Sequence, residues 1–135
     1  TGVQLEKGAT ATPFENRLYG AELALCQRYY WNAVSGNSSA LGLGTQYDSA
    51  TLYTVVSFPV TMRATPTSGC ASGTNYYSFV RNGASNLFNS FTLNVYTSNT
   101  TAELYNNSNI SGTAGQSGWI RTISASSLIA FSAEL

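Results

Sequence analysis

Residues 51–58 read TLYTVVSF, a run of β-branched and aromatic side chains that ends at Pro59. Side chains of these types favour extended backbone, and proline cannot donate to the hydrogen-bond ladder of a central strand. The run therefore predicts a β-strand that stops at residue 58. Similar short runs predict further strands at residues 29–34, 60–63, 76–81, 90–96, 119–123 and 128–135.

Residues 90–96, SFTLNVY, alternate with period two, which places Phe91, Leu93 and Val95 on one face of a strand. We expect that face in the core and the opposite face in solvent. Clusters of Gly, Ser and Asn separate the runs, which recur about every ten residues. This spacing is typical of an all-β fold, an antiparallel β-sandwich or jelly roll, and not of a parallel sheet with crossover helices.

The only helical period lies at residues 19–28, YGAELALCQR, where Tyr19, Leu23 and Cys26 share one face. An acidic residue near the start of this segment and a basic residue near its end complement the helix dipole. We therefore expect one short N-terminal helix ahead of the strands.

Two segments rich in small residues predict irregular structure. Gly42-Leu43-Gly44 has no following Lys-Ser/Thr pair, so it is interpreted as a flexible turn and not as a phosphate-binding loop. Residues 98–117 consist almost wholly of Ser, Thr, Asn and Gly around a short Glu103-Leu104-Tyr105 stretch. This composition predicts a long exposed loop or a short excursion strand.

The composition predicts a surface that is polar but uncharged. The chain has 135 residues, the length of one domain, and only 9% of them are charged, against about a quarter in typical soluble domains. Six basic residues balance six acidic ones, so nucleic-acid binding loses its usual electrostatic driving force. No stretch approaches the roughly 20 apolar residues of a membrane span. We therefore expect no nucleic-acid partner and no membrane insertion.

The sequence contains no histidine, which excludes Ser-His-Asp and Cys-His catalysis and removes the commonest metal ligand. We expect no catalytic site, no metal site and no cofactor. A polysaccharide depolymerase would need two carboxylates across a cleft, and Asp48 with Glu103 is the pair that could supply them. The simpler interpretation of these acids is solubilising charge. Cys26 and Cys70 are expected to be free thiols, with a bridge between them as the alternative.

Aromatic side chains are the main candidates for contacts to a ligand. Nine tyrosines and two tryptophans supply planar faces that stack on sugar rings and polar tips that bind hydroxyl groups. The candidate glycan contacts lie beside turn-rich segments and are Tyr76, Tyr77, Tyr105, Asn106, Asn107 and Trp119. Neighbouring residues of a strand point to opposite faces, so one of Tyr76 and Tyr77 is expected in the core or in a subunit contact. Ordinary packing is likewise the alternative for Trp119.

Four stretches of the chain resemble a widespread family of bacteriophage tail-fibre and tailspike C-terminal regions. They are VQLEKGATATPFE at residues 3–15, YGAELALCQRYYW at 19–31, FPVTMRATPT at 58–67 and IAFSAEL at 129–135. The resemblance does not extend to residues 82–118. This distribution fits a constant frame that carries a variable display surface.

The resemblance implies a homotrimer in the distal part of a virion's tail fibre or tailspike that attaches to the host cell surface. Together with the aromatic, uncharged surface and the absence of histidine, it leads us to expect a non-enzymatic module whose receptor is a host cell-surface polysaccharide or lipopolysaccharide. It carries over no catalytic residue and fixes no binding residue. Residues 1–16 would be a linker or the last strand of an upstream module, and residues 17–135 the C-terminal β-sandwich tip domain. The alternative is a purely structural trimerisation cap of a spike whose binding or enzymatic activity lies upstream.

Overall fold

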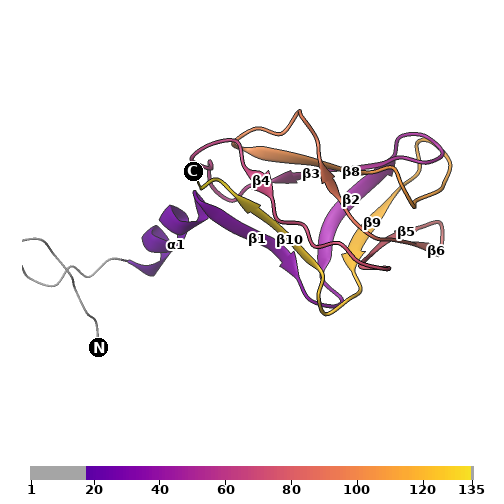
Figure 1. Cartoon of the computed structure of the whole chain (residues 1–135), viewed down its shortest axis with the longest axis horizontal. Coiled ribbons are helices and arrows are strands. Elements are labelled where there is room, and N and C mark those ends of the chain that lie inside the picture. The colour runs from indigo at the N-terminus through magenta and orange to yellow at the C-terminus, as the bar shows by residue number, and fades with distance from the viewer. Residues whose placement is uncertain (1–17, 135) are drawn as a thin grey trace, which may run out of the picture.

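Two antiparallel sheets pack against each other, and a short helix projects from one end (Figure 1). The computed structural model describes residues 18–134, so the linker or strand expected at residues 1–16 lies outside the described residues. The helix is α1 (Tyr19–Gln27). The strands are β1 (Tyr30–Ser35), β2 (Ala40–Gln46), β3 (Leu52–Ser57), β4 (Thr67–Ser68), β5 (Tyr77–Arg81), β6 (Ala84–Phe88), β7 (Thr92–Leu93), β8 (Thr101–Asn106), β9 (Ser117–Thr122) and β10 (Leu128–Ser132).

The smaller sheet has the strand order β1-β10-β4 and the larger one the order β6-β5-β9-β2-β3-β8-β7. Every pair of neighbouring strands is antiparallel. The predicted all-β antiparallel sandwich with one short helix is therefore confirmed.

The core lies between the sheets, and β3 shows how the sequence builds it. Leu52 and Val56 are buried, whereas Tyr53 and Val55 point to the opposite face. Phe79 and Ile120 of the same sheet are fully buried, as are Ile129 and Phe131 of the facing sheet. Each large apolar side chain buried in this way stabilises the fold by about 1.5–3 kcal/mol.

Glycines allow β2 to lie inside the large sheet, so the prediction of a flexible turn at residues 42–44 is wrong. Gly44 is buried, and a Cβ there would lie 2.6 Å from Ile120 Cδ1. A Cβ at Gly118, which is paired with Gly44, would overlap the Val80 carbonyl oxygen. Glycine in a strand often marks such a close approach.

Residues 98–117 are not a long exposed loop, because β8 pairs with β3 on one side and with β7 on the other. Ala102 and Leu104 are fully buried, and Glu103 and Tyr105 point to the opposite face. The apolar residues of this polar segment are spaced for a strand and supply part of the core. The alternative expectation of a short strand is the one that the structure supports.

One other strand prediction holds only in part, and another is wrong. Of residues 90–96 only Thr92–Leu93 form a strand, and the side chain of Val95 is 88% exposed. The backbone turns there, because the Thr97 N–H donates to the Asn94 carbonyl oxygen. Residues 60–63 form no strand, although Met62 is buried and its N–H donates to the Asn99 carbonyl oxygen.

The C-terminal end of the described chain meets the segment that joins α1 to β1. The Ala133 N–H donates to the Tyr29 carbonyl oxygen over 2.7 Å, one residue before β1 begins. Trp31 of β1 stacks on Phe131 of β10 with ring centroids 5.9 Å apart. The loop between β2 and β3 lies at the other end of the sandwich (Figure 1).

The guanidinium of Arg81 is buried and holds the loop between β8 and β9. Its Nε donates to Gln116 Oε1 over 2.7 Å, Nη1 donates to Asn86 Oδ1, and Nη2 donates to the Ser111 carbonyl oxygen. None of these acceptors is a carboxylate. Hydrogen bonds to a charged group are each worth about 1.5–3 kcal/mol, so the clamp is a major local source of stability.

We expect Arg81→Met to lower the free energy of unfolding by about 2–4 kcal/mol, because the three hydrogen bonds of a buried guanidinium are lost. Urea denaturation measures the change. The matched control is Arg121→Met, since Arg121 is exposed and a surface change of this kind costs about 0.5 kcal/mol or less. Equal losses in the two variants would contradict the clamp.

Neither cysteine forms a disulfide. Cys26 is exposed and Cys70 is half-buried, and both are free thiols. Burial raises the pKa of the Cys70 thiol to about 11. The thiol therefore stays protonated, and unreactive, well above neutral pH.

At pH 8 only about one Cys70 side chain in a thousand is a thiolate. We expect iodoacetamide to leave Cys70 of the native protein unmodified and to alkylate it in urea, as peptide mass spectrometry would show. Because the folded-state pKa is raised, the protection should weaken as the pH rises toward 11. Rapid alkylation of native Cys70 at pH 8 would refute this account.

Candidate functional site

The large sheet has an open face that the small sheet does not cover. On this face Trp119 lies between Val80 and Leu43 in the register of the sheet, and Val55 lies beside Glu103. Trp119, Leu43 and Val55 are all more than half exposed. The open face thus carries a row of large exposed apolar side chains, and such contiguous apolar surface is typical of binding sites.

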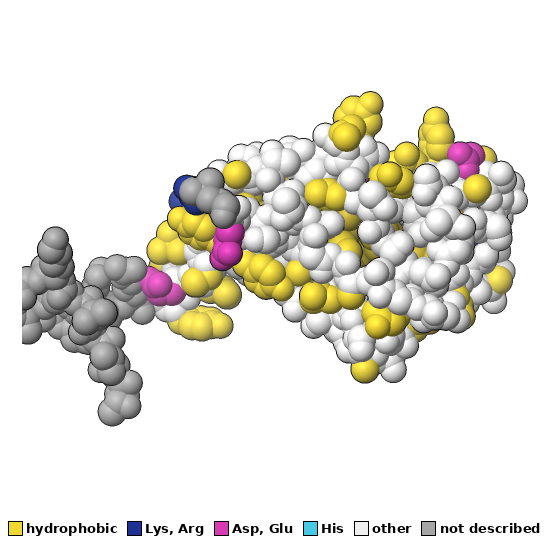
Figure 2. Space-filling model, in the orientation of Figure 1, with side chains coloured by type: hydrophobic (Ala, Val, Ile, Leu, Met, Phe, Trp, Pro, Cys, Tyr) yellow, Lys and Arg dark blue, Asp and Glu magenta, His cyan; other side chains and the backbone are white. Residues whose placement is uncertain are grey.

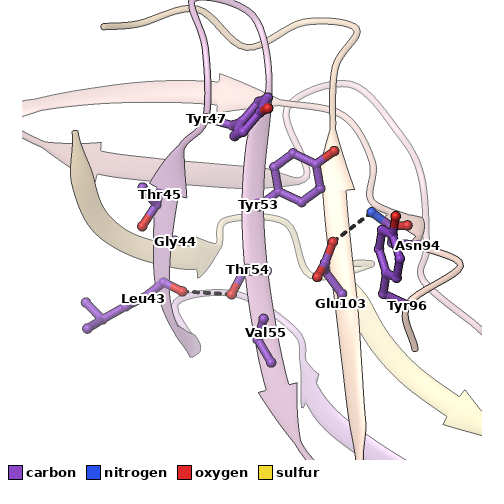
Figure 3. A pocket seen from close by; sticks show the side chains of 10 residues that line it. All are labelled: Leu43, Gly44, Thr45, Tyr47, Tyr53, Thr54, Val55, Asn94, Tyr96 and Glu103. Atoms are coloured by element: carbon purple, nitrogen blue, oxygen red, sulfur yellow. Dashed lines mark hydrogen bonds between the residues drawn. The ribbon is translucent and has the colours of Figure 1, made fainter. Parts of the chain in front are cut away.

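A groove of about 500 Å³ runs across this face between β2, β3, β8 and the segment that follows β7 (Figure 3). We call it the tyrosine groove. Its lining consists of Leu43, Gly44, Thr45, Tyr47, Tyr53, Thr54, Val55, Asn94, Tyr96 and Glu103. Its lining contains one carboxylate and no basic side chain.

Tyr47, Tyr53 and Tyr105 form a continuous aromatic series at one side of the groove. Tyr53 and Tyr105 are directly paired across β3 and β8, and their rings stack with centroids 5.7 Å apart. Tyr47 meets Tyr53 edge to face at 5.6 Å, with an angle of 79° between the ring planes. Two walls of the groove therefore stand nearly perpendicular to each other.

The carboxylate of Glu103 is held in place at the other side of the groove. Asn94 Nδ2 donates to Glu103 Oε1 over 2.7 Å, and the Asn94 N–H donates to the Glu103 carbonyl oxygen. Figure 3 shows the carboxylate between Tyr53 and Tyr96. Partial desolvation, followed by the negative charge of Glu103, raises the pKa of Tyr53.

A second, smaller hollow of about 280 Å³ adjoins the groove, and Leu43 lines both. Trp119 forms part of its wall. The Arg121 guanidinium lies over the Trp119 ring, 5.9 Å from its centroid. The open face therefore presents aromatic side chains along several neighbouring strands.

The structure separates the residues predicted to contact a ligand. Tyr105 stacks on Tyr53 but does not itself line the groove, and Trp119 is exposed at the second hollow on the same face. Asn107 is exposed in the loop after β8, away from the lining of either hollow. Tyr76 is half-buried and packs against the core.

Tyr77 and Asn106 are buried, so the prediction that they contact a ligand is wrong for both. The Tyr77 hydroxyl lies 2.6 Å from the Ala71 carbonyl oxygen and 2.8 Å from that of Leu128, and burial raises its pKa. Asn106 Nδ2 donates to the Ser90 carbonyl oxygen over 2.8 Å. Both side chains serve the fold by satisfying backbone acceptors in the interior.

Asp48 does not line the tyrosine groove, so the pair nominated for glycoside hydrolysis does not share this cavity. Asp48 Oδ1 accepts the Ala50 N–H and Oδ2 accepts the Thr51 hydroxyl, which closes the turn between β2 and β3. These hydrogen bonds, the one from Ala50 first, lower the pKa of Asp48. The groove offers a single carboxylate, whereas the usual glycosidase mechanisms use two.

Within residues 18–134, no three His, Cys, Asp or Glu side chains gather in a way that could hold a metal ion. In the same part of the chain, no helix has the length and apolar character needed to cross a bilayer.

Helix α1 presents a second unusual surface, because none of its residues is buried. Leu18 and Tyr19 are each 81% exposed, and Leu23 and Leu25 are more than two-fifths exposed. Figure 2 shows apolar side chains gathered at this end of the molecule, beside a body that is mostly uncharged. A nine-residue helix is only marginally stable in water without tertiary packing. The apolar side chains of α1 therefore remain largely exposed in the described part of the chain.

Comparison with known proteins gives no relative: no family model matches the chain, and no curated protein or solved structure matches it either.

Proposed function

We propose that the chain is a non-enzymatic attachment module from the distal part of a bacteriophage tail fibre or tailspike. It assembles as a homotrimer and binds a saccharide of the host cell surface, within a polysaccharide or lipopolysaccharide. The observation that carries the attachment function is the tyrosine groove on the open face of the large sheet. The four family-like stretches quoted above support the viral origin.

The groove has the size and chemistry that a sugar requires. Its volume of about 500 Å³ is within the usual range of ligand sites, roughly 300–1,000 Å³. Tyr47 and Tyr53 offer ring faces to the apolar side of a pyranose, and Thr45, Asn94 and Glu103 offer hydrogen-bonding groups to its hydroxyls. Because only 9% of the chain's residues are charged, saccharide binding rests mainly on these short-range contacts.

The exposed surface of α1 supports assembly through copies of the same chain. Every copy exposes the same apolar side chains, and closed symmetry lets each copy cover its neighbour's. Helix α1 and the loop between β2 and β3 lie at opposite ends of the sandwich (Figure 1). Assembly through α1 would therefore leave the Tyr47 side of the groove open to a ligand.

We expect Tyr53→Thr to weaken saccharide binding about tenfold or more, because a stacking ring is lost while a strand-compatible side chain remains. The measurement is binding of the full chain to an array of bacterial surface polysaccharides and lipopolysaccharides. Trp119→Thr is the matched control, since Trp119 is an exposed aromatic on the same face that does not line the groove. Unchanged binding by Tyr53→Thr would rule out the groove as the attachment site.

A substitution that places a charge on α1 tests the proposed trimer. We expect the unmodified chain to have about three times the monomer mass by light scattering at micromolar concentration, and Leu23→Lys to have the mass of a monomer. Leu23 is partly exposed on α1, so the substitution leaves the core intact. Val95→Lys, on a fully separate exposed turn, should retain the trimer. A monodisperse monomer of the unmodified chain would refute assembly.

The second candidate function is a purely structural trimerisation cap, and the apolar surface of α1 is the observation that favours it. A chain that forms trimers but binds no saccharide on the array would support the cap and refute attachment.

A further inference from the structure

We infer that the tyrosine groove selects a ligand that carries a positively charged nitrogen, an ammonium group displayed by a surface polymer. The inference rests on the proposed attachment function and specifies the chemistry of its ligand. Amino sugars with a free amine, choline substituents and aminoacyl esters all present this group.

The first argument is charge. Glu103 places one carboxylate in the groove, and no Lys or Arg side chain lines it. The nearby Arg81 guanidinium is buried and already donates to Gln116, Asn86 and Ser111. The negative charge of Glu103 therefore has no cationic partner in the lining. An anionic sugar would meet repulsion there, whereas an ammonium group would supply the missing charge.

The second argument is the arrangement of the rings. A flat stacked platform suits a neutral pyranose, but Tyr47 and Tyr53 meet at 79° and form a corner. Tyr96 supplies a further ring near the Glu103 carboxylate (Figure 3). Ring faces attract a cation that lies within about 6 Å of their centroids, and several rings around one cation form an aromatic cage. The groove combines such a corner with a carboxylate.

The third argument is preorganisation. The hydrogen bond of 2.7 Å from Asn94 fixes the Glu103 carboxylate through Oε1 before any ligand arrives. Because the bond uses the side-chain amide of a neighbouring segment and not a cation, it orients the carboxylate without neutralising it. Leu43 and Val55 line the same groove and offer apolar contact to methyl or methylene groups on the nitrogen. A fixed charge and fixed rings reduce the entropy that binding costs.

The test uses the full chain and isothermal titration calorimetry with three probes. These are choline chloride, an oligosaccharide of glucosamine with free amines, and the same oligosaccharide fully N-acetylated. We expect the free-amine oligosaccharide or choline to bind at least tenfold more tightly than the acetylated probe, and added salt to weaken that binding. If only the free-amine oligosaccharide binds, the groove selects a primary amine. If only choline binds, it selects a quaternary ammonium group.

The decisive variant is Glu103→Gln, which keeps an oxygen acceptor for Asn94 but removes the charge. We expect it to lose the preference for the charged probes by at least tenfold, whereas Glu134→Gln, an exposed acid beside the small sheet, should keep it. Thermal unfolding checks that both variants are folded. Equal binding of acetylated and free-amine probes by the unmodified chain would overturn the ammonium inference.

The two levels of the proposal fail in different ways. If Tyr53→Thr abolishes saccharide binding but Glu103→Gln leaves affinity and probe preference unchanged, the attachment function stands and the ammonium inference falls. If Tyr53→Thr leaves saccharide binding unchanged, the groove is not the attachment site and both fall.

Discussion

The structure depends on the antiparallel pairing of β3 with β2 on one side and β8 on the other. This pairing places Leu52 and Val56 in the interior and, by the same alternation, Tyr53 and Val55 on the open face. The aliphatic core and the aromatic groove are thus two consequences of a single register. A slip of one residue would exchange them, which would cost both the stability and the site.

The same constraint explains why β2 is rich in glycine. Gly44 lies directly beneath the side chains of Ile120 and Leu52, and its pairing partner Gly118 lies against the backbone of β5. Small residues at the centre of the sheet let the neighbouring side chains fill the interior without displacement. The large sheet therefore stays continuous beneath the groove, which gives its tyrosines a rigid support.

The sequence predicts those elements whose signal is local. Residues 51–58, 76–81 and 119–123 correspond to β3, β5 and β9, because β-branched and aromatic side chains there satisfy both propensity and burial. The helix was also predicted, but the absence of any buried residue on α1 could not be. The sequence does not predict β2, and it offers β8 only as one of two alternatives, because their glycine and polar residues favour turns and only their neighbours in the sheet make them strands.

The site was less predictable for the same reason. The outward direction of Tyr53 follows from alternation with Leu52 and Val56. Tyr105 is a candidate only because it is an aromatic residue beside turn-rich segments. Their juxtaposition requires β3 to pair with β8 across more than 45 residues of chain, and no local pattern encodes that contact. Glu103 was nominated for catalysis, although its partner proved to be Asn94 and not Asp48.

The hydrogen bond between Ala133 and Tyr29 determines where the protein can be tagged or coupled to a surface. The described chain enters and leaves the sandwich at one pole, beside α1, while the opposite pole consists of loops alone (Figure 1). A fluorescent protein or affinity tag fused close after Glu134 would lie near the exposed apolar side chains of α1. A surface coupled through a short insertion in the opposite loops would leave α1 untouched. The geometry of the two poles therefore decides how the module should be immobilised.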